Sequence, residues 1–207
     1  MIDWKEVIKI NNPQVVISKE GKFIYFRPGK TAGNSIDNLT IRKYYPDSIR
    51  SNYTETNRFE NYSGDLFKDT IESISNEELE SYYKFVSVRN PWERLVSLAA
   101  YMKCSVQHII NLADKELEER RFGSLRAHYL PYNTMIEYKR KKVVDKVLRL
   151  ESLDDDWIEV REKLKLPKLQ ISNKSEHKHY RDVLTEDQVK WVKKYYKKDI
   201  KLTGYKY

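Results

Sequence analysis

Residues 23–35 read FIYFRPGKTAGNS, a β-prone run of four residues that leads directly into a loop with two glycines. Ile36, Leu39 and Ile41 then follow at a helical spacing, and Pro46 marks where that helix should stop. The order of strand, glycine-containing loop and helix is typical of α/β folds. It also predicts an anion site, because the backbone N–H groups and the dipole at the start of the helix both attract negative charge.

The side chains of this loop suit a phosphate group. Lys30 would supply a full positive charge, and Thr31 and Ser35 would supply hydroxyl donors. Gly29 and Gly33 would let the backbone approach the ligand closely. For the loop taken alone, the alternative is a tight strand-to-helix turn that carries a surface lysine.

Gly29, Lys30 and Thr31 also resemble the end of a Walker A motif. That motif requires a second glycine five residues before Gly29, and Ile24 stands there, inside the predicted strand. The full motif therefore fails, which argues against a nucleoside triphosphatase. A P-loop nucleotide or nucleoside kinase stays the alternative enzyme, and dependence on magnesium would distinguish it.

Residues 85–97, FVSVRNPWERLVS, repeat the arrangement of strand, turn and helix. Arg89 ends the strand, where ligands bind in open α/β sheets, and its guanidinium can hold a phosphate through two N–H groups. Pro91 suits the first helical turn, and Ser97 could donate to the same phosphate. Arg94 either faces the same way or pairs with an acid. Alone, Arg89 could cap a carboxylate and Ser97 could face solvent. Together with the first loop, the motif predicts a cofactor with two anionic ends.

The remaining hydrophobic runs continue the α/β pattern over one domain, residues 1–207. Residues 15–18 should pair with residues 23–26 as a hairpin, because a Glu-Gly turn lies between them. A further strand is predicted over 143–150, and helices over 153–164 and 188–197. We expect a P-loop-like α/β fold of three layers, with a central, mostly parallel sheet flanked by helices.

Composition limits the partners. The net charge of +8 reflects either a lysine-rich surface or a polyanionic partner, and a non-enzymatic polyanion-binding protein stays an alternative. Cys104 is the single cysteine, and the four histidines lack the spacing of metal ligands, so no metal is expected. No nucleic-acid-binding pattern stands out. The first residues do not form a signal peptide and no run is long enough to span a bilayer, so we expect a cytoplasmic protein with no membrane span.

At its two anion motifs the chain resembles the sulfotransferases that use 3′-phosphoadenosine 5′-phosphosulfate (PAPS), and specifically their carbohydrate branch. In that family the second segment binds the 3′-phosphate, a role that falls here on Arg89 and Ser97. A late basic loop near the donor includes Lys174, and Arg27 opens the first loop. The first loop binds the 5′-phosphosulfate, a role that falls here on Lys30, Thr31, Ala32, Gly33, Asn34 and Ser35.

The sequence departs from the family pattern at two places. Asn34 stands where the family usually has threonine, although an amide can still donate a hydrogen bond. Several relatives carry a general-base histidine upstream of the 3′-phosphate arginine, whereas residues 65–69 here read DLFKD. His128 is our first candidate for the base, and stacking on the acceptor or binding it is the alternative role.

Other titratable residues stay open as the base or as ligands. The polar segment that holds the base in other members offers Glu55, Asp65 and Lys68. His108 falls in an apolar helical stretch and is expected in the core, while His177 and His179 should contact cofactor or solvent. The resemblance implies an acceptor hydroxyl on a carbohydrate, and the basic balance of the chain fits an acidic glycan. A protein that binds PAPS but has lost catalysis is a further alternative.

Overall fold

The five-stranded sheet at the centre of the computed structural model positions the site. The structure describes residues 2–11, 14–50, 64–119, 126–170 and 177–207. The strands lie in the order β3 (Ile49–Arg50), β1 (Val15–Ser18), β2 (Phe23–Phe26), β4 (Tyr83–Val88) and β7 (Lys146–Arg149). β1 pairs antiparallel with β2 and β3, whereas β2, β4 and β7 are mutually parallel. The predicted hairpin and the mostly parallel sheet are confirmed.

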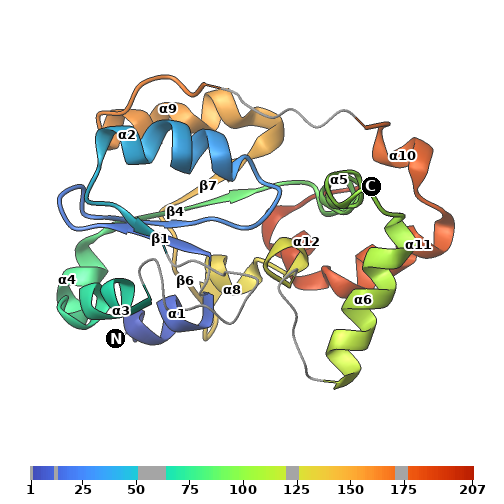
Figure 1. Ribbon diagram of the computed structural model, residues 1–207, viewed down its shortest axis with the longest axis horizontal. Helices are drawn as coiled ribbons and strands as arrows, with labels where there is room; N and C mark the ends of the chain where they lie inside the picture. Colours follow the sequence, from blue (N-terminus) through green and yellow to red (C-terminus); the bar gives the residue numbers. More distant parts are fainter. Residues whose placement is uncertain (1, 12–13, 51–63, 120–125, 171–176) are drawn as a thin grey trace.

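Helices cover both faces of this sheet (Figure 1). The π-helix η1 (Asn34–Ile41), α2 (Arg42–Tyr44) and α9 (Leu153–Lys163) lie on one face. The other face carries α1 (Trp4–Asn11), α3 (Gly64–Glu72), α4 (Asn76–Ser81) and α8 (Asn133–Ile136). Side chains alternate along β2. Phe23 and Tyr25 pack in the first core, between the sheet and α9, while Ile24 and Phe26 pack in the second core, between the sheet and α1. A strand buried on both faces explains its uninterrupted apolar run.

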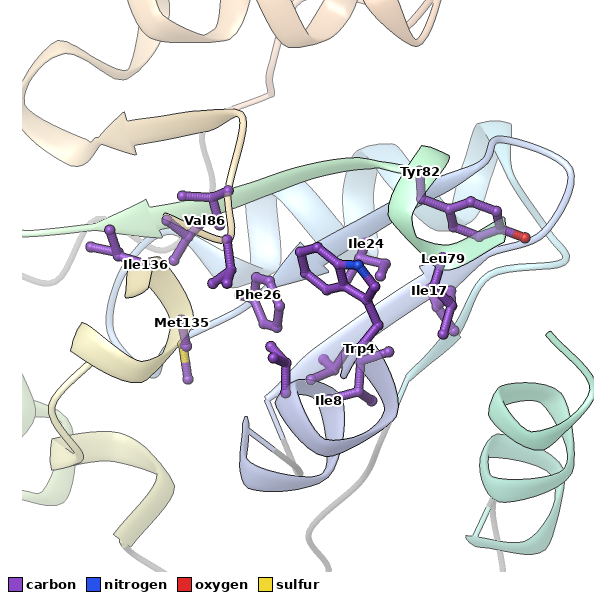
Figure 2. Packing of buried hydrophobic residues seen from close by; sticks show 14 of the residues in the cluster. Trp4, Ile8, Ile17, Ile24, Phe26, Leu79, Tyr82, Val86, Met135 and Ile136 are labelled. Carbon is purple, nitrogen blue, oxygen red and sulfur yellow. The ribbon is translucent and has the colours of Figure 1, made fainter. Parts of the chain in front are cut away.

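The second core is built around the first helix. Figure 2 shows Trp4 and Ile8 of α1 packed beneath Ile24 and Phe26 of β2. All four side chains are almost fully inaccessible to solvent. This packing fixes the position of β2, and therefore of the loop that follows it.

A third cluster of helices lies beyond the carboxyl end of β4. It contains α5 (Pro91–Met102), α6 (Val106–Glu119), α7 (Arg126–Tyr129), α10 (Tyr180–Val183), α11 (Glu186–Tyr195) and α12 (Lys197–Thr203). Pro91 starts α5 as predicted, and the Asn90 side chain accepts hydrogen bonds from the N–H groups of Trp92 and Glu93. Thr185 caps α11 in a capping box with Gln188.

Some boundaries differ from the sequence predictions. The last strand covers only Lys146–Arg149, because Leu150–Ser152 form the 3-10 turn η2. A small hairpin of β5 (Glu137–Tyr138) and β6 (Lys141–Lys142) precedes it. His108 was expected in the core and is exposed, because α6 buries Val106, Ile109 and Ala113 on its opposite face.

Within the described residues, no helix combines the length and the apolar character needed to cross a bilayer.

Candidate active site

A cavity of about 810 Å³ opens where β2, β4 and β7 end. This is the edge at which open α/β sheets bind ligands. The cavity brings together the two predicted anion motifs and His128, which lies in α7. Lys174 falls outside the described residues. The lining of the cavity consists of Arg27, Pro28, Gly29, Lys30, Ala32, Gly33, Asn34, Ser35, Arg89, Glu93, Ser97, Tyr101, His128, Leu150, Glu151, Ser152, Leu153, Asp154, Asp155 and His177.

The loop after β2 has an unusual backbone. Lys30 and Ala32 adopt left-handed φ angles of 67° and 64°. Alternation between left- and right-handed residues turns successive N–H groups toward one side and forms an anion-binding concavity. Gly33 is right-handed, with φ of −53°. A Cβ at this position would lie 2.8 Å from the Nε of Arg27, so a larger residue would require the Arg27 side chain to shift.

Thr31 does not present its hydroxyl to the cavity, contrary to the sequence prediction. The side chain is fully buried, and its hydroxyl donates to the carbonyl of Pro28 at 2.6 Å. That oxygen lies 2.8 Å from the Ser87 hydroxyl, which in turn lies 2.7 Å from the Tyr25 hydroxyl. Because Thr31 has one hydroxyl proton, Ser87 must donate to Thr31 and Tyr25 to Ser87. Thr31 therefore holds the shape of the loop, and only its main chain is left to meet a ligand.

Arg27 contributes positive charge beside the loop. Its Nε lies 3.2 Å from the buried carboxylate of Asp37, which also pairs with Arg42 and Arg50. Three guanidinium groups around one carboxylate leave this region positive. The second guanidinium branch of Arg27 donates to the side-chain oxygen of Asn34 at 3.1 Å. The Asn34 oxygen is thus used, which orients its N–H₂ group as the donor available to an anion.

Lys30 and Tyr101 lie together at the cavity. The Lys30 Nζ is 4.1 Å from the centre of the Tyr101 ring, a cation–π contact. Burial lowers the pKa of Lys30, and the nearby charge of Arg89 adds to this effect. Tyr101 is 59% exposed, so much of its ring is open to solvent at the cavity.

His128 is held as a neutral imidazole. Burial, together with the charges of Arg94, Lys30 and Arg27, lowers its pKa from 6.5 to about 4. Its Nδ1 is buried and has no hydrogen-bond partner among the described residues. The ring lies 5.9 Å from the ring of Tyr101. A neutral imidazole beside Lys30 has one unprotonated nitrogen that can accept a proton, and its low pKa makes it a weak base.

Arg94 neither lines the cavity nor pairs with an acid among the described residues. It is 1% exposed, and its guanidinium donates to the carbonyls of Gly29, Leu130 and His128 at 2.9, 2.8 and 3.0 Å. These bonds tie the anion loop to the segment that carries His128. Arg94 is therefore a positioning residue, which the sequence pattern alone did not reveal.

Arg89 keeps part of its hydrogen-bonding capacity. One branch pairs with Glu93 at 3.1 Å and lies 3.5 Å from Nε2 of His177. The other donates to the carbonyl of Lys30 at a long 3.5 Å. Its Nε is buried without a partner among the described residues. Arg89 does bind a carboxylate, as the alternative interpretation held, and it still retains a donor for a ligand.

Three cavity residues share one face of α5. Glu93, Ser97 and Tyr101 are spaced by four residues, which places them on neighbouring turns. Glu93 and Tyr101 were missed from the sequence, although their spacing from Ser97 could have identified them. On the opposite side, Glu151 accepts from the N–H of Asn90 at 2.7 Å and from the Tyr205 hydroxyl at 2.6 Å.

Acid should destabilise the protein partly through His128. Between pH 6.5 and about 4 the unfolded chain binds a proton at this residue and the folded chain does not. The contribution of His128 to the free energy of unfolding is therefore fully present above pH 6.5 and is lost as the pH falls toward 4. Over this pH range the free energy of unfolding should fall by about 1–2 kcal/mol less in His128→Asn than in wild type. Urea unfolding at pH 7 and pH 4.5 measures it, and equal losses in both proteins would contradict the prediction.

The structure is an α/β protein in which both predicted anion motifs line one cavity at the ends of the parallel strands. A family model described as "Sulfotransferase family" matches residues 13–206, nearly the whole chain. The chain therefore belongs to the sulfotransferase family, whose members are transferases and generally use PAPS as the sulfuryl donor. Comparison with curated proteins and with solved structures gives no significant match.

Proposed function

We propose that this protein transfers the sulfuryl group of PAPS to a hydroxyl group of an acceptor, and that the acceptor is a carbohydrate. The observation that carries the proposal is one cavity that joins a left-handed, lysine-bearing loop to the buried, unpartnered Nε of Arg89. A ligand with two anionic ends satisfies both. The loop is P-loop-like in its role, since its backbone and Lys30 would hold phosphate oxygens.

The residues fit the two ends of the donor. The loop from Arg27 to Ser35 would hold the 5′-phosphosulfate, with Asn34 donating through its amide. Arg89 and Ser97 would hold the 3′-phosphate from β4 and α5. When bound, the donor would supply an electrophilic sulfur atom. The oxygen of the acceptor hydroxyl bonds to this sulfur as the bond between the sulfur and the phosphate oxygen breaks.

Lys30 and His128 would act on opposite sides of this exchange. Lys30 would stabilise the negative charge that develops on the leaving phosphate oxygen. To do so its Nζ would leave the face of Tyr101, a weak contact that is easily replaced. His128 would take the hydroxyl proton at the unprotonated nitrogen of its ring, because burial and nearby cations keep the imidazole neutral.

The other candidates for the base have weaker support. Glu55 and the side chain of Asp65 fall outside the described residues, and Lys68 pairs on the surface with Glu72 at 3.8 Å. His177 lies beside Arg89 rather than beside Lys30, and His179 caps α10. His128 lies close enough to Lys30 for the charge of that lysine to lower its pKa.

A carbohydrate acceptor fits the cavity mouth. Tyr101 offers an exposed aromatic ring next to Lys30 and His128, and the apolar face of a sugar ring packs well on such a surface. The positive charge around Arg27, Arg42 and Arg50 would suit an acidic glycan.

Calorimetric titration with adenosine 3′,5′-bisphosphate, the desulfated product, tests the donor assignment. We expect micromolar or tighter binding that needs no metal, and much weaker binding of ATP with magnesium. Binding of ATP and not of the bisphosphate would overturn the proposal in favour of the kinase alternative. If the bisphosphate binds but PAPS is never consumed with any of a panel of saccharides, the protein has kept donor binding without catalysis.

A further inference from the structure

Two neighbouring side chains that line the cavity each carry an unpartnered polar atom, one a donor and the other an acceptor. The Nε of Arg89 is a buried donor, and the Oε2 of Glu93 is a buried acceptor, and neither has a hydrogen-bond partner among the described residues. The two side chains are joined through their other atoms, since the Arg89 guanidinium pairs with Oε1 of Glu93 at 3.1 Å. Both residues line the cavity.

The ion pair alone does not account for Glu93. Pairing with Arg89 uses Oε1, and His177 approaches the same oxygen at 3.7 Å. Oε2 is left buried without a donor, which costs about 1–3 kcal/mol unless a ligand or water satisfies it. A carboxylate beside an anion site also repels the anion, so its presence there calls for a second contact that favours the ligand.

The pair is complementary to a phosphate whose neighbouring carbon carries a hydroxyl group. Arg89 would bind the phosphate oxygen through Nε, and the Glu93 carboxylate can face only a hydrogen-bond donor. On a ribose that is phosphorylated at the 3′ position, the adjacent donor is the 2′-hydroxyl. Arg89 lies in the turn before α5 and Glu93 in the first turn of that helix, and their ion pair at 3.1 Å keeps both groups at the same end of the cavity.

We propose that Glu93 is a specificity-determining residue that accepts a hydrogen bond from the ribose 2′-hydroxyl of the donor nucleotide. The proposal rests on the proposed function, because it assumes that the cavity binds a 3′-phosphorylated nucleoside. It assigns the recognition of both substituents to the start of α5 and the turn before it, with Arg89 binding the 3′-phosphate and Glu93 the 2′-hydroxyl. A nucleotide that carries a phosphate at the 2′ position would place negative charge against Glu93 and be rejected.

A double-mutant cycle between protein and ligand tests this contact by calorimetry. The ligands are adenosine 3′,5′-bisphosphate and its 2′-deoxy analogue, and the proteins are wild type, Glu93→Ala and Glu93→Gln. Wild type should bind the deoxy analogue about 10- to 100-fold more weakly, the range for a hydrogen bond to a charged group. Glu93→Ala should bind both ligands equally. Glu93→Gln keeps an acceptor oxygen and should retain part of the discrimination.

Glu162→Ala, which removes an exposed carboxylate from α9, is the matched control for net charge and should discriminate as wild type does. Equal discrimination in wild type and Glu93→Ala would overturn the proposal, and so would a wild type that binds both ligands alike. Failure of the proposed function has a different result, since neither bisphosphate would then bind to the wild type.

Discussion

Replacing Arg89 with alanine is expected to weaken the binding of adenosine 3′,5′-bisphosphate by about 30- to 150-fold, which corresponds to about 2–3 kcal/mol. The variant loses the buried Nε that we assign to the 3′-phosphate, and it leaves the carboxylate of Glu93 without its cationic partner. That carboxylate would then repel the ligand. Arg89→Lys keeps the charge but not the planar fork, so we expect an intermediate loss.

The effect should belong to the 3′-phosphate alone. Adenosine 5′-monophosphate lacks this group and would not contact Arg89. Its affinity should therefore change less than about threefold in Arg89→Ala. Arg161→Ala, a partly exposed arginine on α9, serves as the matched control and should bind both ligands as wild type does. A similar loss for the monophosphate and the bisphosphate would remove the assignment of Arg89 to the 3′-phosphate.

The sequence predicted the elements that position the site, because their signals are local. The apolar run of β2 is continuous since both faces of the strand are buried, and the following glycine-containing loop marks its end. Pro91 and Asn90 mark the start of α5 in the same way. Both motifs line the cavity because parallel strands bring their carboxyl ends to one edge of the sheet.

The direction of individual side chains could not be predicted, because it depends on contacts between distant segments. Thr31 turns inward through Ser87 of β4, a residue that is 56 positions away. Hydrophobic periodicity contains no information on such a pairing. His128 likewise lies in a segment that Arg94 joins to the loop after β2, through hydrogen bonds to the carbonyls of His128 and Gly29. The role of Arg94 could therefore be recognised only from the three-dimensional structure.

Arg94→Met should lower the free energy of unfolding by about 3 kcal/mol or more. The guanidinium is buried and satisfies three carbonyl groups, and methionine fills most of its volume without donating to any of them. Arg94→Lys retains the charge and reaches fewer carbonyls, so its loss should be smaller. Urea unfolding measures both, with Arg161→Met as the control that should stay within about 0.5 kcal/mol of wild type.

A second measurement separates positioning from general destabilisation. The charge of Arg94 lowers the pKa of His128, so Arg94→Met should raise that pKa from its value of about 4, whereas Arg94→Lys should not. NMR titration of the imidazole in the folded variants reports this directly. If the pKa of His128 is the same in all three proteins, Arg94 acts only on stability. If it rises in Arg94→Met alone, the arginine that joins the anion loop to His128 also sets the protonation state of the candidate base.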